Sequence, residues 1–161
     1  MADHGINVSR ADTAVATPNA ATCGIPFVIG TAPLSKATGT AATAGTPVLC
    51  TSYTEAEEQL GYDNDWAKFT VCEVMYYHFK LCACQPVIFL PLAENAEAEA
   101  VAAAVEQVEA CLTMFGIVPD LIMAPGFSKE ATVAAALAAK VGSINLSLIH
   151  ISEPTRHAQI S

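Results

Sequence analysis

The apolar run PVIFLPL, residues 86–92, decides the fold because neither of its faces is polar. Strands at the centre of a parallel sheet are buried on both sides and therefore read as continuous apolar runs rather than alternating ones. Apolar runs of a similar kind occur at residues 24–33 (GIPFVIGTAP), 47–53 (PVLCTSY) and 120–125 (DLIMAP). We predict that all four segments are strands.

Between these runs the sequence has helical periodicity. Residues 67–82 place apolar side chains at three- and four-residue steps, and a stripe before Gly116 does the same. The members of that stripe are Val101, Val105, Val108, Leu112 and Phe115. A capping box at Thr54–Glu57, a cap at Asn95 and a cap at Ser128 are the expected helix starts. Gly61, Gly116 and Gly142 are the expected ends, the last closing a helix over residues 129–141.

Strands that alternate with helices predict an α/β fold with a mostly parallel sheet flanked by helices, joined by right-handed crossovers. Residues 24–145 would form this domain. Residues 1–23 are small and polar and can bury little surface, so we expect an extended arm that a partner holds in place.

Composition excludes several classes of protein. The chain has 161 residues, a formal charge of −9 and only seven Lys and Arg, with no basic cluster, which argues against nucleic acid as a partner. No apolar run reaches the roughly 18–20 residues of a membrane span. The start of the chain lacks a basic segment followed by an apolar one, so we expect no secretory signal and six reduced Cys in a cytosol.

The sequence predicts no catalytic or cofactor-binding residues. The loop GTAPLSKATGT, residues 30–40, follows a strand but matches neither phosphate-binding glycine motif. In APGFSKE, residues 124–130, Ser128 stands between a strand and a helix, where a nucleophile would stand, but the spacing is not GxSxG. A helix cap accounts for Ser128 without any chemistry.

The sequence also predicts no metal site. His78 and Cys82 are one helical turn apart, with Cys84 beyond them and Cys72 before them, but the spacing of zinc ligand pairs is missing. We expect these four residues to be buried or partly exposed parts of the core. Two acidic pairs, Asp63 with Asp65 and Glu57 with Glu58, are assigned to the solvated surface. We therefore expect a protein that is not an enzyme.

The wording and order of several segments resemble the contractile tail sheath proteins of myovirus-like phages and prophages. The segments are HGI (4–6), GIPFVIGTAPL (24–34), PVLCTSYTEA (47–56), QPVIFLPL (85–92) and the run from Gly116 to Asn145. The resemblance covers most of residues 4–145, and its strongest blocks are FVIGTAP and PDLIMAPGFS. These motifs are structural, so their specificity lies in their combination and spacing.

The resemblance implies a structural subunit that polymerises in six-membered rings around a tail tube and contracts to drive the tube through the host envelope, without hydrolysing a nucleotide. Its partners would be other sheath subunits, the tube protein and the baseplate. It would assemble in the cytoplasm of the bacterial host and reside in the virion tail. Terminal arms link neighbours by adding strands, which assigns His4, Gly5, Ile6 and Val8 to an inter-subunit contact.

Two features depart from that family. Relatives often carry an extra surface domain where this chain has only residues 93–98, and they continue with further strands and helices after residue 145. Residues 146–156, LSLIHISEPTR, instead match one reading frame of a widely used transposase sequencing adapter letter for letter. We therefore expect residues 146–161, with His150 and His157, to be translated adapter, and residues 24–145 to be an incomplete sheath-type domain.

Two alternatives remain open. A phage-tail-like bacteriocin uses the same kind of sheath, and only genomic neighbours would distinguish it from a phage. A small Rossmann-like ligand-binding domain or enzyme would hold its ligand at the carboxyl ends of the strands, near Gly30–Lys36 and Ala124–Ser128. A nucleotide that remains bound through purification would favour this second alternative.

Overall fold

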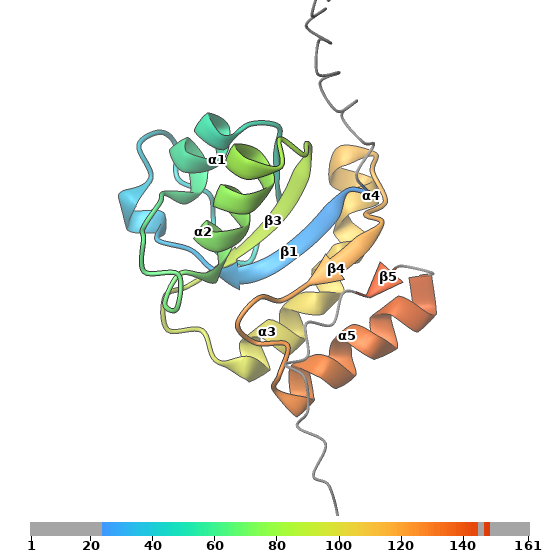
Figure 1. Ribbon diagram of the computed structural model, residues 1–161. Coiled ribbons are helices and arrows are strands. Elements are labelled where there is room, and N and C mark those ends of the chain that lie inside the picture. Colours follow the sequence, from blue (N-terminus) through green and yellow to red (C-terminus); the bar gives the residue numbers. More distant parts are fainter. Residues whose placement is uncertain (1–23, 145–146, 149–161) are drawn as a thin grey trace, which may run out of the picture.

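The fold is a five-stranded sheet with helices on both faces, seen in the computed structural model in Figure 1, which describes residues 24–144 and 147–148. The strand order is β2-β3-β1-β4-β5. The strands are β1 (Pro26–Thr31), β2 (Val48–Cys50), β3 (Val87–Leu92), β4 (Leu121–Met123) and β5 (Ser147–Leu148). The predicted α/β class with a mostly parallel sheet is confirmed, because β3, β1, β4 and β5 run parallel.

The two central strands are those with the longest apolar runs. β1 and β3 pair in parallel from Phe27 opposite Ile88 to Thr31 opposite Leu92. Every residue of both strands is buried, so both faces of the sheet are covered here, as the lack of a polar face in PVIFLPL predicts.

The edge strand β2 departs from the parallel arrangement. It pairs antiparallel with β3, with Leu49 opposite Ile88, so no parallel crossover joins β1 to β2. Only Cys50 of its three residues is buried. A short edge strand that follows a long loop can pair in either direction, because little core packing fixes its course.

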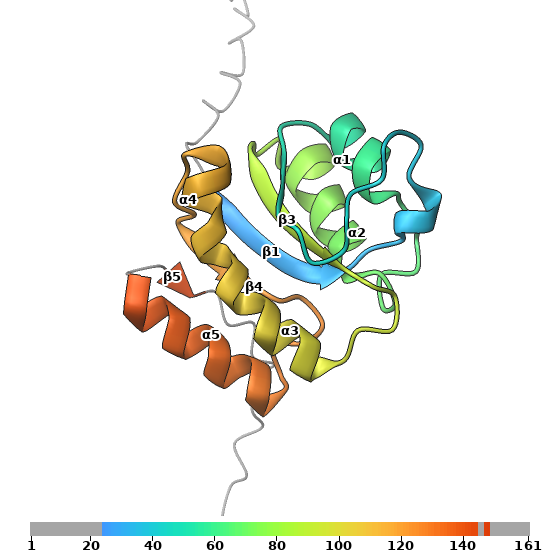
Figure 2. The same ribbon diagram turned by 180° about the vertical axis from the view of Figure 1, so that it is seen from behind.

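Two helical layers cover the sheet (Figures 1 and 2). One layer holds α1 (Tyr53–Leu60) and α2 (Thr70–Met75), which continues as a π-helix over Tyr76–Leu81. The other holds α3 (Ala98–Ala104), a 3-10 helix (Val105–Glu109), α4 (Ala110–Phe115) and α5 (Ala131–Ile144). Val28, Val71 and Phe89 pack in the first core, and Phe27, Val101 and Leu137 pack in the second.

Several predicted helix ends are wrong by two or three residues. The capping box is Ser52 with Glu55: Ser52 Oγ accepts the Glu55 N–H at 3.2 Å, and Glu55 accepts the Thr51 N–H at 2.8 Å. Glu97 rather than Asn95 precedes α3, and α5 begins three residues after Ser128 and continues through Gly142. Gly61 and Gly116 end α1 and α4 as predicted, both at positive φ.

The apolar stripe before Gly116 is broken by the 3-10 helix. Val101, Val105 and Val108 are buried, but Leu112 is 58% exposed and Cys111 is buried in its place. A 3-10 helix turns about 120° per residue against about 100° in an α-helix, so five such residues rotate the stripe by about 100°, or one α-helical position. The periodicity of the sequence gives no sign of this shift.

The fifth strand lies inside the segment that we expected to be translated adapter. Ser147 and Leu148 pair in parallel with Leu121 and Ile122 of β4. Strand pairing uses main-chain groups that every residue except proline shares, so the pairing does not bear on the origin of this segment. Both expected terminal segments, the arm over residues 1–23 and the rest of residues 146–161, otherwise lie outside the described residues.

Candidate functional site

The crevice at the carboxyl ends of β1 and β4 is the place where a doubly wound sheet would bind a ligand. Here the first residues of α2 occupy it. Thr31 Oγ1 accepts the Thr70 N–H at 3.2 Å and donates to the Lys68 carbonyl at 2.5 Å. The last residue of β1 therefore caps the start of α2. A Cβ on Gly126 would lie 2.7 Å from Thr70 Cγ2, and one on Gly30 would clash with Thr70 Oγ1.

The absence of a side chain at Gly30 and Gly126 therefore lets a helix, not a ligand, approach the sheet. Among the described residues the buried Thr70 Oγ1 has no hydrogen-bond partner, which further indicates that close packing determines this contact. Lys36, the cation of the adjacent loop, forms an ion pair with Asp63. These contacts fill the region around Gly30–Lys36 that the ligand-binding alternative requires.

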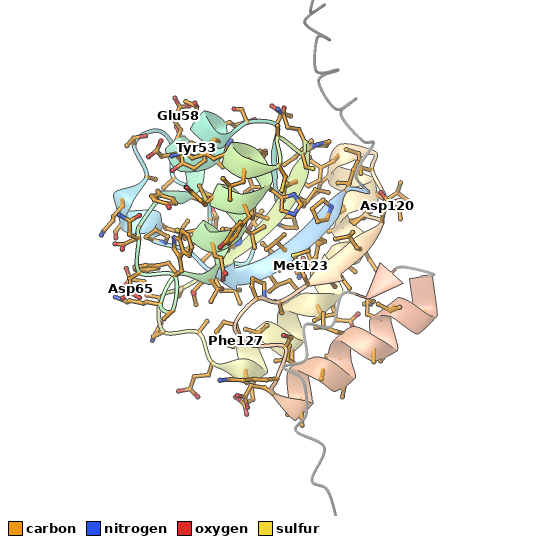
Figure 3. The ribbon with its side chains drawn as sticks, viewed as in Figure 1. Tyr53, Glu58, Asp65, Asp120, Met123 and Phe127 are labelled. Carbon is orange, nitrogen blue, oxygen red and sulfur yellow. The ribbon has the colours of Figure 1, made fainter. Side chains whose placement is uncertain are left out.

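A second and more open feature lies along β4. Ile122 is buried, but Leu121 and Met123 on either side of it are only half buried, unlike every residue of β1 and β3. Alternate residues of a strand point to opposite faces, so one face of β4 is covered and the other is open. In Figures 1 and 3 this open face is toward the viewer, with Met123 at its front, and α3 lies behind it.

The open face borders a hollow of about 180 Å³ beside α2 and its π-helix. Its walls are Glu73, Val74, Tyr77 and His78 on one side and Met123, Ala124, Pro125 and Ser128 on the other. We call this feature the β4 groove. Tyr77 lies at its rim and is 45% exposed. The π-helix places Tyr77 and His78 here, consistent with the frequent use of such segments at functional sites.

Ser128 and His78 both line the β4 groove, but they do not form a nucleophile and base. Within the described residues no hydrogen bond joins them, and the buried Nδ1 of His78 has no partner to orient the ring. Burial lowers the pKa of His78, which favours a neutral ring at pH 7. Ser128 also does not begin α5: its N–H donates to the Ala124 carbonyl at 3.0 Å, in the turn after β4.

The cysteines and His78 do not converge. Among the described residues no group of three or more His, Cys, Asp or Glu side chains lies close enough to hold a metal ion. Cys72 is buried in the α2 core, whereas Cys82 is exposed beyond the π-helix. Burial raises the pKa of Cys72 to about 11 and that of Cys50 to about 12, so both stay protonated thiols at neutral pH.

Aromatic side chains support the π-helix from the α1 side. Lys80 Nζ lies 3.9 Å from the centre of the Tyr53 ring, with Tyr62 and Tyr76 within 6 Å, and Trp66 packs against Tyr76 and Tyr77. This cluster was not predicted, although the adjacent residues Tyr76 and Tyr77 are visible in the sequence. It fixes the segment that presents Tyr77 to the β4 groove.

The acidic pair Asp63 and Asp65 has a structural role. Asp63 accepts the Asp65 N–H at 2.8 Å, and Asp65 accepts the Lys68 N–H at 3.3 Å, which shapes the turn before α2. The hydrogen bond from Lys36 lowers the pKa of the Asp63 carboxyl. The predicted arm contacts His4, Gly5, Ile6 and Val8 lie outside the described residues, as do His150 and His157.

Comparison with known proteins adds no identification. No protein-family model matches the chain, and no curated protein matches it. Within the described residues no helix has both the length and the apolar character needed to cross a membrane.

Proposed function

We propose that residues 1–145 are the N-terminal part of a contractile tail sheath subunit, a structural protein that works by assembling with copies of itself. The observation that carries the proposal is the one-sided burial of β4. A sheet that is covered on both faces at β1 and β3 but open at Leu121 and Met123 leaves apolar surface that another polypeptide can bury.

In this proposal the β4 groove is a seat for a neighbouring subunit. Its partly exposed apolar side chains, Met123 and Pro125, would supply the buried area, and Tyr77 would be the aromatic anchor at the rim. The arm, with His4, Gly5, Ile6 and Val8, would extend to another neighbour by strand addition. The tube protein and baseplate would be the remaining partners, in the virion tail, after assembly in the host cytoplasm.

Contraction would then be a change between two packings of the same subunits, with the energy stored during assembly. Such a mechanism needs rigid subunits, and the capped start of α2 and the packing of Thr70 against Gly30 support rigidity at the centre of this one. It needs no catalytic residue, so the proposed protein is not an enzyme. Residues 146–161 would have no part in it, in line with their match to an adapter.

The second candidate is a small-ligand domain. The observation in its favour is that Glu73, Tyr77, His78 and Ser128 bring polar groups to one hollow. Against it stands the packing of α2 into the crevice between β1 and β4, where such folds bind nucleotides. Native mass spectrometry of the purified chain discriminates, since a retained nucleotide or metabolite would favour the ligand-binding candidate.

The test of the sheath proposal starts from the source DNA, read across the codon for Asn145. The complete reading frame that contains residues 1–145 is then expressed and imaged by electron microscopy. Tubular polymers built from six-membered rings are the expected result. A product that stays monomeric at every concentration overturns the proposal.

A further inference from the structure

A second apolar surface, on the opposite layer from the β4 groove, lies where the chain enters the fold. Leu112 on α4 and Val118 in the loop after it are 58% and 54% exposed. With Val108, Glu109 and Pro119 they line a hollow of about 160 Å³. We call these residues the α4 patch. Two large apolar side chains this exposed and close together form an apolar surface on which another segment can pack.

The first described residues lie next to this patch. The Ile25 N–H donates to Asp120 Oδ2 at 2.7 Å, the Asp120 N–H donates to the Ile25 carbonyl at 2.9 Å, and Asp120 directly follows Pro119 of the patch. Ile25 also packs on the core that α4 covers. Figure 3 places Asp120 beside α4. Residues 1–23 are therefore tethered within a few residues of the exposed Leu112 and Val118.

The composition of the tethered segment changes in the middle. Residues 1–12, MADHGINVSRAD, contain Asp3, His4, Arg10 and Asp12, whereas residues 13–23, TAVATPNAATC, contain no charged residue. An extended stretch of eleven residues reaches roughly 36 Å, ample for a patch on a helix of six residues, which is about 9 Å long. Tethering also gives the segment a high effective concentration at the patch.

We infer that residues 13–23 dock on the α4 patch of the same chain, with Val15, their largest aliphatic side chain, among the groups that cover Leu112. Docking of residues 13–23 would fix the direction in which residues 1–12 leave the folded domain. The inference goes beyond the proposed function and does not depend on it, because the contact forms within one unassembled chain.

Hydroxyl-radical footprinting of the full chain tests the inference with an internal control. Leu81, on the π-helix, is 58% exposed, the same fraction as Leu112, so bare side chains would be oxidised at similar rates. We expect Leu112 to be oxidised about threefold or more slowly than Leu81, which corresponds to a segment docked for about two thirds of the time or longer. This protection should not change when the protein is diluted.

Two variants within residues 1–23 identify the segment. Val15→Asp should bring the oxidation rate of Leu112 close to that of Leu81, while the matched variant Val8→Asp should leave the protection unchanged. Equal rates for the two leucines in the unaltered chain overturn the inference. Protection that grows with concentration assigns the patch to a second copy, and protection that survives Val15→Asp assigns it to another segment; both results also overturn it.

Discussion

The side chain of Thr31, at the end of β1, accepts a hydrogen bond at 3.2 Å from the backbone N–H of Thr70, the first residue of α2. The same hydroxyl donates to the Lys68 carbonyl, so one buried side chain ties the start of the helix to the centre of the sheet. This link closes the crevice where a doubly wound fold would bind a ligand.

The tight contact at Gly30 gives the first prediction. Gly30→Ala should destabilise the fold by about 2–3 kcal/mol, because the new methyl group would meet Thr70 Oγ1 and Val71 in a packed core. Gly142→Ala is the control: it has open space within α5 and should stabilise by about 0.5–1 kcal/mol. Urea unfolding measures both, and equal effects would contradict the packing described for α2.

The hydroxyl of Thr31 can be tested without changing the shape of the side chain. Thr31→Val should cost about 1–3 kcal/mol, because the Thr70 N–H loses its acceptor in a buried place. Thr31→Ser keeps the hydroxyl and should retain the hydrogen bond, with the smaller loss of one methyl group. If the Val variant proves as stable as the Ser variant in urea, the cap has no energetic role.

The ring of His78 predicts a loss of stability in mild acid. Burial lowers the pKa of His78 in the folded state below its usual value near 6.5. The unfolded chain therefore binds a proton first as the pH falls, so stability that is present above pH 6.5 is lost as the pH falls through the folded pKa. Between pH 7.5 and 5, the free energy of unfolding of His78→Gln should fall less than that of the unaltered chain. A parallel fall in both proteins would show that His78 is not the cause.

The buried thiols predict a loss of stability at alkaline pH. Burial raises the pKa of Cys50 to about 12 and that of Cys111 to about 11, against 9.0 for an ordinary thiol. Above pH 9 the unfolded chain loses these protons while the folded chain keeps them, so stability falls as the pH rises. Cys111→Ala should flatten this fall between pH 9 and 11, and Cys82→Ala, at an exposed position, should not. An identical alkaline slope in the two variants would refute the assignment.

Charged substitutions can test the role of the β4 groove in assembly without unfolding the protein. Met123→Asp and Tyr77→Asp should prevent self-association of the complete reading-frame product, because each puts a charge into the apolar contact. Both side chains are partly exposed, so the unfolding transition should survive. Leu81→Asp is the matched control on an exposed residue outside the groove. Light scattering reads the result, and normal assembly by both groove variants would exclude the groove as an interface.

The strands were predictable because burial on both faces leaves a direct mark in the sequence, as in PVIFLPL and GIPFVIGTAP. The antiparallel direction of β2 was not, since three residues at an edge carry no mark of the partner's direction. The burial of Cys111 in place of Leu112 could not be predicted from the helical periodicity either. A 3-10 segment changes the angle per residue without changing the composition.

The candidate surfaces were harder to predict than the fold. The β4 groove joins Tyr77 and His78 to Met123 and Ser128, residues some 50 positions apart that only the packing of α2 beside β4 brings together. The sequence singled out His78 as a possible ligand and Ser128 as a possible nucleophile, but it could not show that the two residues line the same groove. Because β4 is a run of three apolar residues, nothing in the sequence marks Leu121 and Met123 as half buried.

Electron microscopy of the protein expressed from the complete source reading frame that contains residues 1–145 tests the sheath proposal at its core. Tubular polymers of stacked six-membered rings are expected, and Met123→Asp should abolish them. A protein that remains monomeric at high concentration, with the β4 groove still open, would contradict the proposal.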